Sequence, residues 1–395
     1  MAQTLLRASV GEVFWAFLKL GLTCFGGPIA HLGYFREEFV TRRRWLSEAA
    51  YADLVALCQF LPGPASSQLG FSLGLMRAGW GGACAAFVAF TLPSALAMTS
   101  LALMAARFEG SLALGLMHGM KLVAVAIVAQ AVLGMARSLC PDRERASIAV
   151  MSVVLLALAP VSIGMMLAIL LGGMAGALLG RGQASPGAAF ALPITKAAGA
   201  LAFLLFAALL IVLPMLSGAS QSVALFDRFY RAGSLVFGGG HVVLPLLEAA
   251  TVQPGWVGED RFLTGYAAAQ AVPGPLFSFA AWLGASLVPE PNGIPGAAIA
   301  MAGLFLPGFL LVISALPFWN ALRSRRMAQS AMQGANAAVV GILGAALFDP
   351  VFTSAVATML DFSLALLCFV ALVAWKAPPW VVVLLGAGGG SMLPG

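Results

Sequence analysis

Two short runs of amide, hydroxyl and break-forming residues carry most of the chemistry that this sequence suggests. They contain Gln59, Pro62, Gly63, Pro64, Ser66 and Ser67 in one run, and Gln270, Pro273, Gly274, Pro275 and Ser278 in the other. Proline lacks an N–H and clashes inside a helix, so each Pro-Gly-Pro must break a helix. The helix that starts after the break exposes N–H groups at the positive end of its dipole, which attracts anions. We therefore expect a cradle for a small oxyanion, with Gln amides and Ser hydroxyls as further ligands.

Each of these features also has a simpler interpretation. A Pro-Gly-Pro run can merely kink two packed helices, and a Gln beside it can merely bind the freed peptide groups. Repetition favours the functional interpretation, because the same Gln-to-proline spacing occurs twice.

The two runs belong to a longer internal duplication. Phe25-Gly26-Gly27 matches Phe237-Gly238-Gly239 at an offset of 212 residues, and the Pro-Gly-Pro runs match at 211. Gly26, Gly27, Gly238 and Gly239 are predicted hinges or close-approach points of the backbone, as are Pro64 and Pro275. Apolar halves that are broken at the same place are typical of secondary transporters with a binding site at the break.

Three cations within apolar segments could balance the charge of an anion. Lys19 and Arg231 stand six residues before Phe25 and Phe237, and Lys121 lies in the middle of the apolar stretch 111–136. Such cations are costly in a membrane and usually face a cavity or a partner. The alternatives are snorkelling to an interface for Lys19 and Arg231, and a structural ion pair for Lys121.

A proton-coupled mechanism would need groups that titrate or carry protons. The candidates are Glu48, Asp53, Glu259, His31 and His241. Histidine changes its charge near neutral pH, although a lone histidine at a segment end is more often interfacial. Glu48 and Glu259 are matched across the duplication, and Asp53 falls within residues 51–76, which we predict to form a re-entrant hairpin.

The composition places the chain in a membrane. Of the 395 residues, 61% are hydrophobic and only 9% are charged, against about 25% charged residues in soluble domains. The net charge of +6 comes from short loops and does not indicate nucleic-acid binding. Five cysteines without metal-ligand spacing, and the absence of a Walker motif, predict neither a metal nor another cofactor.

The predicted organisation is two repeats, 1–180 and 196–395, joined by a polar linker at 181–195. Arg42-Arg43-Arg44 follows the first apolar segment, whereas the matching loop around Glu259 and Asp260 is acidic on balance. If 51–76 is a re-entrant hairpin folded at Pro62-Gly63-Pro64, the arginine-rich loops of both halves share one side. We therefore predict an all-α polytopic membrane protein with inverted halves and re-entrant breaks, and leave open whether 146–180 crosses once or folds into more than one segment.

The motifs also resemble a known family. Phe25-Gly26-Gly27-Pro28, Tyr34 to Val40, Trp45-Leu46 and Gln59 to Pro64 are similar to the chromate ion transporter family. Phe237 to Pro245, Trp256 and Gln270 to Pro275 resemble the second repeat of its long members. The second half lacks the cluster of Arg36 and Arg42 to Arg44, so the repeats are not expected to act equally.

This resemblance implies a carrier in the bacterial inner membrane that exports chromate, driven by the proton gradient, and confers chromate resistance. A sulfate importer or exchanger and a passive anion channel are the alternatives, because sulfate shares the shape and charge of chromate. A reductase is disfavoured, because Cys58, beside Gln59, is the one residue that would support such a reaction. No enzymatic activity is therefore expected. The expected partners are chromate or a sulfate-like oxyanion and membrane lipid, with a homodimer left open and no nucleic acid.

Overall fold

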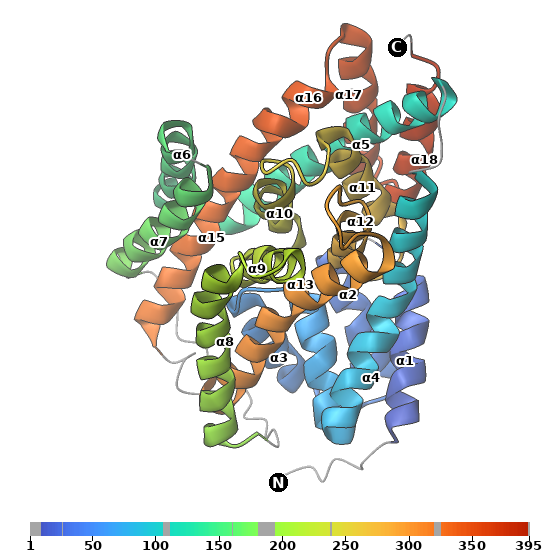
Figure 1. The fold of residues 1–395 in the computed structure, drawn as a ribbon. Helices are drawn as coiled ribbons and strands as arrows, with labels where there is room; N and C mark the ends of the chain where they lie inside the picture. The colour runs from blue at the N-terminus through green and yellow to red at the C-terminus, as the bar shows by residue number, and fades with distance from the viewer. Residues whose placement is uncertain are drawn as a thin grey trace.

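A computed structural model describes residues 9–25, 27–105, 111–159, 161–180, 194–237, 239–319 and 325–393. The first half contains α1 (Val10–Thr23), α2 (Gly27–Arg36), the π-helical η1 (Glu37–Arg42), α3 (Glu48–Phe60), α4 (Ala65–Ala105), α5 (Ser111–Leu139), α6 (Arg143–Leu158) and α7 (Val161–Leu179). Helix α8 (Lys196–Leu216) follows, and the described part of the chain contains no strand (Figure 1).

The second half repeats this order. It contains α9 (Gln221–Ser234), η2 (Gly240–Val242), α10 (Val243–Thr251), α11 (Glu259–Ala271), η3 (Leu276–Ser278), α12 (Phe279–Ala285), α13 (Gly293–Ala315), η4 (Leu316–Phe318), α15 (Arg326–Ala346), η5 (Leu347–Phe352), α16 (Thr353–Ala355), α17 (Met359–Val373) and α18 (Pro379–Gly390). Gly26 and Gly238 lie outside the described residues, as does most of the predicted linker.

The predicted hairpin at 51–76 is confirmed. Helix α3 is 13 residues long and starts at its cap, Ser47, whose side chain accepts from the N–H of Ala50. Helix α4 starts after Pro64 but leaves helical geometry at Ala78 and Gly79, where φ of Gly79 is +65°. The chain reverses there, so Gly74 packs so closely on Gly82 that a Cβ would stand 2.3 Å from the Gly82 oxygen. Both helical segments of this hairpin are therefore too short to cross a membrane.

The same reversal occurs in the second half. A Cβ on Gly284 of α12 would stand 2.3 Å from the oxygen of Gly296, at the start of α13. Only glycine permits this backbone approach, and the pairs 74/82 and 284/296 lie at the corresponding reversals of the two halves. The re-entrant unit is thus built twice from the same close contacts.

The first apolar segment, which precedes Arg42, is also a hairpin. Glu12 at the start of α1 lies 3.7 Å from the guanidinium of Arg43, just after η1. It also lies 3.8 Å from the guanidinium of Arg77, at the reversal of α4. Helix α2 and η1 therefore return to the side where α1 begins, and we call this side the arginine end.

The two halves have opposite orientation in the bundle. Beyond the reversal, α4 runs for roughly 35 Å at 1.5 Å per residue, and its Leu103 reaches Gly293 at the start of α13. Helix α13 runs back, and the indole N–H of Trp319 donates to Asp53 of α3 at 3.1 Å. The loop before α13 and the start of α11, with Glu259 and Asp260, form the opposite, acidic end. The predicted inversion is confirmed by these contacts.

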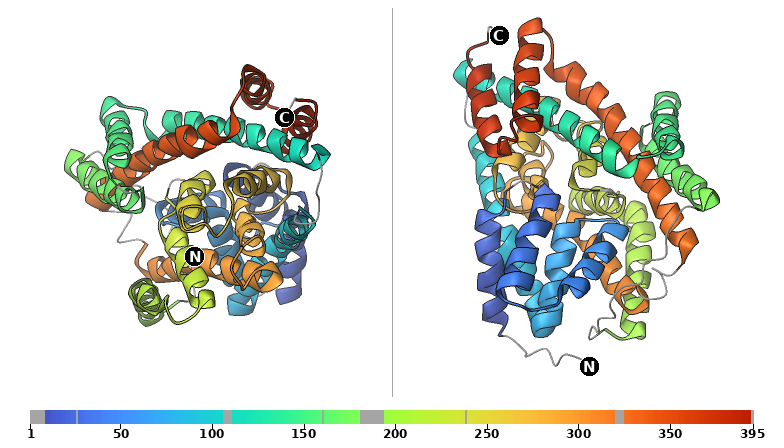
Figure 2. Two further views of the ribbon diagram at one scale, coloured as in Figure 1. Left: turned by 45° about the horizontal axis from the view of Figure 1, so that its top comes forward. Right: turned by 180° about the vertical axis from the view of Figure 1, so that it is seen from behind.

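One long helix of each half packs against the last two helices of the other half. Helix α5 packs on α17 and α18, whereas its counterpart α15 packs on α6 and α7. A Cβ on Gly119 of α5 would stand 2.2 Å from the oxygen of Gly386, and one on Gly334 of α15 would stand 2.0 Å from that of Gly172. Figure 2 shows α5 and α15 as a layer along one side of the bundle of α1–α4 and α8–α13. We call α5–α7 and α15–α18 the arms and the rest the bundle.

Residues 146–180, left open from sequence, form a pair of helices. Asp142 and Arg145 at the start of α6 line the same small cavity as Gly176 and Leu179 at the end of α7. The two helices are therefore antiparallel and turn around near Pro160, which itself lies outside the described residues.

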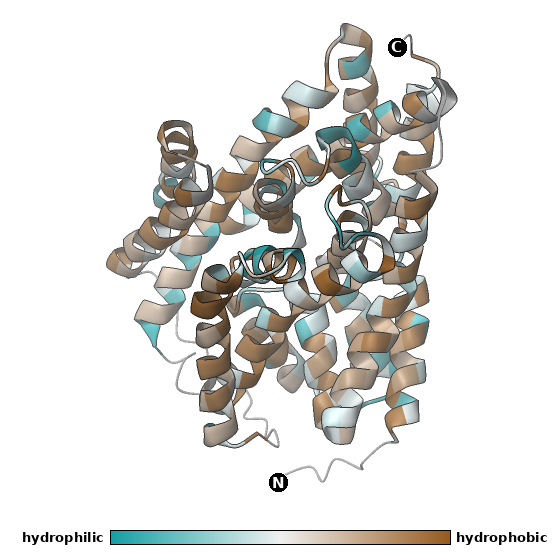
Figure 3. Cartoon of the chain, viewed as in Figure 1, coloured by the Kyte–Doolittle hydropathy of each residue, from teal (hydrophilic) through white to brown (hydrophobic). Residues whose placement is uncertain are grey.

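Five of the described helices contain a stretch that is long and apolar enough to cross a membrane: 65–105, in its part beyond Gly79, and 114–139, 196–216, 293–318 and 326–355. Helix α8 exposes Leu201, Phe203 and Leu204 and is coloured hydrophobic along most of its length in Figure 3. Such a surface suits lipid rather than water, so the protein is a multi-pass membrane protein.

Candidate functional site

The two Pro-Gly-Pro runs form extended loops between short helices. Leu61 and Val272, which end α3 and α11, have extended backbone. Gly63 and Gly274 follow with φ of +123° and +105°, a region that favours glycine. The prolines on either side supply no N–H, so each loop has a single amide donor, on its glycine.

Each glycine uses that donor to bind the other half. The N–H of Gly63 donates to the carbonyl of Val236 at 2.7 Å, and the N–H of Gly274 donates to the carbonyl of Cys24 at 2.9 Å. Cys24 is the C-cap of α1 and Val236 lies two residues after the end of α9, and each stands directly before the duplicated Phe-Gly-Gly. Each Pro-Gly-Pro loop is therefore bonded to the residue before the Phe-Gly-Gly motif of the opposite half.

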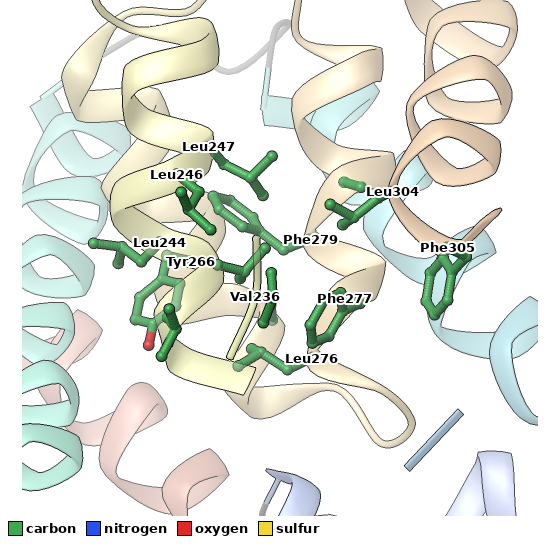
Figure 4. Close-up of a cluster of buried hydrophobic side chains, with 14 of the residues drawn as sticks. Val236, Leu244, Leu246, Leu247, Tyr266, Leu276, Phe277, Phe279, Leu304 and Phe305 are labelled. Carbon is green, nitrogen blue, oxygen red and sulfur yellow. The ribbon is translucent and has the colours of Figure 1, made fainter. Parts of the chain in front are cut away.

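Two hinge glycines within the described residues have positive φ. Gly27 has φ of +75° and Gly239 of +141°, and neither has a described atom within 4 Å of where a Cβ would be. They need glycine for backbone conformation, not for close packing. Val236, one residue before this motif, lies in a cluster of apolar side chains with Leu276, Phe277 and Phe279 (Figure 4).

The predicted hydroxyls are buried beside the breaks. Ser66 and Ser67 are 3% and 2% exposed in the first turn of α4, and Ser278 is 1% exposed in η3. The hydroxyl of Ser67 has no hydrogen-bond partner among the described residues. A buried hydroxyl without a partner is costly, so this position suits a ligand or water.

Gln68 was not predicted as a site residue, yet its side chain hydrogen-bonds the first break loop to the other half. Its Nε2 donates to the carbonyl of Pro62 at 2.9 Å and to that of Gly308, in the other half, at 3.0 Å. The side chain is fully buried, and its Oε1 has no partner among the described residues. The available signal was an amide in the first turn of an otherwise apolar helix.

The two predicted glutamines differ in environment. Gln59 is exposed on α3, whereas Gln270 on α11 is 8% exposed and its Nε2 has no partner within the described chain. The duplication is therefore symmetric in sequence at these positions but asymmetric in burial.

Each predicted cation pairs with a carboxylate. Lys19 lies 3.4 Å from Glu38, Arg231 pairs with Asp227 one turn earlier, and Lys121 lies 2.7 Å from Asp260. For Lys121 this is the structural alternative noted above, and the pair joins an arm to the bundle. No ion pair in the described chain joins a cation to a break loop.

The proton-carrying candidates are scattered. Glu48 pairs with Arg36 at 2.6 Å on the surface, and Asp53 accepts from Trp319. His31 is fully buried with both ring nitrogens unpartnered among the described residues, and Glu259 leaves its Oε1 without a partner there.

His241 has the most specific contact of this set. Its Nδ1 lies 2.6 Å from the hydroxyl of Tyr266, one turn before Gln270 on α11. Figure 4 shows this hydroxyl at the edge of the apolar cluster, pointing away from the phenylalanine rings. Tyr266 was not predicted, since a tyrosine in an apolar helix gives no signal without its partner.

Glu248 is a further titratable group that the sequence analysis missed. It lies on α10, outside the five spanning helices. Burial raises the pKa of this carboxyl to about 7, with smaller contributions from the negative charges of Glu259 and Asp349, against a hydrogen bond from Gln253. A single glutamate within Val243–Thr251 was the available signal.

No group of three or more His, Cys, Asp or Glu side chains within the described residues could hold a metal ion. The five cysteines are free.

Comparison with known proteins identifies the fold's relatives. Residues 11–177 and 223–391 each match the family described as Chromate transporter. A chromate transport protein of Pseudomonas aeruginosa is 28% identical over 389 residues, covering 96% of this chain and 91% of that protein. A chromate transport protein of Cupriavidus metallidurans is 28% identical over 365 residues, covering 90% and 84%.

A probable chromate transport protein of Synechococcus elongatus is 29% identical over 349 residues, covering 86% of this chain and 84% of that protein. No solved structure matches the chain significantly. The two family matches contain both break loops, both Phe-Gly-Gly motifs and both arms, and α8 lies between them. The chain belongs to the chromate transporter family.

Proposed function

We propose that this protein exports chromate, or a similar tetrahedral oxyanion, across the bacterial inner membrane, driven by the proton gradient, and thereby confers chromate resistance. The observation that supports the proposal is the bonding of each break loop to the opposite half, where Gly63 donates to Val236 and Gly274 donates to Cys24. A broken backbone at membrane depth is tolerated where it is enclosed by protein or lines a polar cavity. The names of the relatives support chromate as the substrate.

The donors of the proposed site lie beside the break glycines. Because Gly63 and Gly274 already donate to the other half, they shape the loops and do not supply N–H groups. The first-turn amides of α4, the hydroxyl of Ser67 and the amide of Gln270 are the groups we assign to the anion. In this proposal the repeats 1–180 and 196–395, joined by 181–195, contribute one loop each.

Inside-out membrane vesicles test both the substrate and the driving force. Export from a cell corresponds to uptake by these vesicles, so chromate uptake should be saturable and should increase when the vesicle interior is acidified. Gln270→Ala and Gln59→Ala should reduce uptake, whereas Gln329→Ala, an amide on α15 outside the site, should not. Normal uptake in both site variants at normal protein levels would remove the glutamines from the site.

The same vesicles separate the alternatives. A carrier exchanges labelled for unlabelled substrate across the membrane, whereas a channel conducts without such counterflow. Sulfate uptake that chromate inhibits only weakly would identify a sulfate transporter. Chromate flux that is unaffected by the pH gradient would contradict proton coupling.

A further inference from the structure

Matching faces of α3 and α11 have opposite exposure. Position for position, the duplication pairs 52 with 263, 56 with 267 and 59 with 270. On α3 all three side chains are exposed: Ala52, Ala56 and Gln59. On α11 all three are buried: Leu263, Ala267 and Gln270. Two helices that should be equivalent are therefore covered in one half and uncovered in the other.

The arms account for this difference. Helix α5 packs along α11, and Lys121 of α5 binds Asp260 at the start of α11 at 2.7 Å. The mirrored contact would join α15 to α3, but these two fully described helices do not pack along each other. The counterpart of Lys121 is Asn336, whose Oδ1 has no partner among the described residues. Glu48, which could receive a cation there, binds Arg36 instead.

The uncovered face of α3 is unsuited to lipid. It carries two alanines and an amide, whereas the lipid-facing surface of α8 carries Leu201, Phe203 and Leu204. An exposed amide in a hydrocarbon layer would lack hydrogen-bond partners. The face leads from Glu48, near the arginine end, to Gln59, directly before the first break.

The two ends of the bundle can be assigned to sides of the membrane. Arg42, Arg43, Arg44 and Arg77 lie at the arginine end, while Glu259, Asp260 and Glu290 lie at the acidic end. Lysine and arginine in short loops favour the cytoplasm. The covered α11 face therefore leads toward the periplasm, and the uncovered α3 face leads toward the cytoplasm.

We propose that this conformation is the cytoplasm-open state of the transporter, and that α5, fastened by Lys121 and Asp260, is its closed periplasmic gate. The inference deepens the proposed function and rests on the protein being a carrier. Inverted repeats alternate access by exchanging their conformations, so the other state would uncover α11 and cover α3 with α15. Lys121 is 13% exposed and Asp260 69% exposed, and a pair with one side in water is weak enough to open in each cycle.

Labelling from each side of the membrane tests the gate without any substrate. Single substitutions Ala56→Cys and Ala267→Cys are made in the native chain, and label beyond that of the native cysteines is read by mass. A membrane-impermeant thiol reagent should modify Ala56→Cys from the cytoplasmic side and should leave Ala267→Cys unmodified from either side. Adding Lys121→Gln or Asp260→Asn should make Ala267→Cys reactive from the periplasmic side severalfold faster.

Two further variants make the result specific to the ion pair. The charge exchange Lys121→Asp with Asp260→Lys should restore protection of Ala267→Cys, and Asn336→Ala, the mirrored control, should leave protection intact. A monodisperse size-exclusion profile excludes misfolding for each variant. Protection of Ala267→Cys that survives both pair-breaking variants overturns the gate, as does labelling of Ala56→Cys only from the periplasm.

A reversible cross-link tests whether the gate must open. Lys121→Cys and Asp260→Cys, joined by a short disulfide-containing bifunctional reagent, should stop chromate uptake, and reduction should restore it. Uptake at the full rate in the cross-linked protein overturns the gate. If the native chain transports no chromate at all, the proposed substrate fails, while the labelling pattern still decides the gate.

Discussion

The Cα of Gly308 lies 2.9 Å from where a Cβ on Gly63 would stand, although the two glycines belong to opposite halves. The mirrored contact also exists, because a Cβ on Gly274 would stand 2.8 Å from the hydroxyl of Ser94. Positions 94 and 308 each follow a proline inside a long helix, Pro93 and Pro307. Each break loop therefore packs beside the intrahelical proline of the other half.

Gly63→Ala and Gly274→Ala should both destabilise the protein. The Cβ would overlap the neighbouring half and would also require a positive φ, so each change should cost on the order of 2 kcal/mol or more. Thermal unfolding in detergent measures the effect, with Gly134→Ala as control, since no described atom lies within 4 Å of a Cβ there. Equal unfolding temperatures for Gly63→Ala and Gly134→Ala would contradict the packing described.

Gly176→Ala should loosen the arms, whereas Gly173→Ala on the same helix should not. A Cβ at 176 would stand 2.3 Å from the oxygen of Ser330 on α15, but one at 173 would stand 3.6 Å from its nearest neighbour. Overpacking of this kind costs about 1–3 kcal/mol. Unfolding temperatures of the two variants are compared at equal protein concentration. The expected order would be wrong if Gly173→Ala were the less stable variant.

Tyr266→Phe should weaken the response of transport to a pH gradient. It removes the hydroxyl that lies 2.6 Å from Nδ1 of His241, and losing one such hydrogen bond costs about 1 kcal/mol, or roughly fivefold in rate. Gradient-driven uptake and substrate counterflow are measured side by side, and only the former should fall. Tyr230→Phe is the matched control, because that hydroxyl donates to the carbonyl of Phe206, in another part of the bundle. A fall in counterflow equal to the fall in driven uptake would indicate a structural role.

Glu248→Gln should change how stability depends on pH. The native carboxyl has its pKa raised from 4.5 to about 7 by burial first and by Glu259 and Asp349 second. Between these values the native protein holds a proton that the unfolded chain has released, so stability falls as the pH rises across that window. The glutamine variant lacks this loss and should unfold at a temperature a few degrees above that of the native protein at pH 8.

At pH 5, where the native carboxyl keeps its proton, the two unfolding temperatures should nearly agree. Gln253→Ala provides a control, because it removes the hydrogen bond to Glu248 but leaves the carboxyl. A difference between Glu248→Gln and the native protein that is the same at pH 5 and pH 8 would show that Glu248 does not titrate as described.

The sequence was sufficient for the features that proline and glycine dictate. The breaks at Pro62-Gly63-Pro64 and Pro273-Gly274-Pro275 and the opposite orientation of the halves follow from local backbone rules and from arginine placement, and the structure confirms them. The hairpin of α1 and α2 was not predicted, because the sequence between the two helices contains no break as strong as Pro-Gly-Pro.

Long-range partners could not be predicted from one sequence. Lys121 was expected to meet either a carboxylate or the substrate, and nothing in the pattern indicates Asp260, which lies 139 residues away. The packing of α5 on α17 and α18, and of α15 on α6 and α7, could not be predicted for the same reason. The glycines of α5 and α15 predict close packing, but they do not indicate which helix is the partner. Gln68 was overlooked because its two acceptors are carbonyls, which any residue could supply.

The packing of α5 on α17 and α18 also sets an order for biogenesis. The ribosome completes α5 long before α17 and α18, the helices on which it packs, have been synthesised. The glycine-lined surface of α5 therefore lacks its packing partners in the bilayer until the end of translation. Insertases or chaperones that shield such surfaces would act on the first half of this protein for longer than on the second.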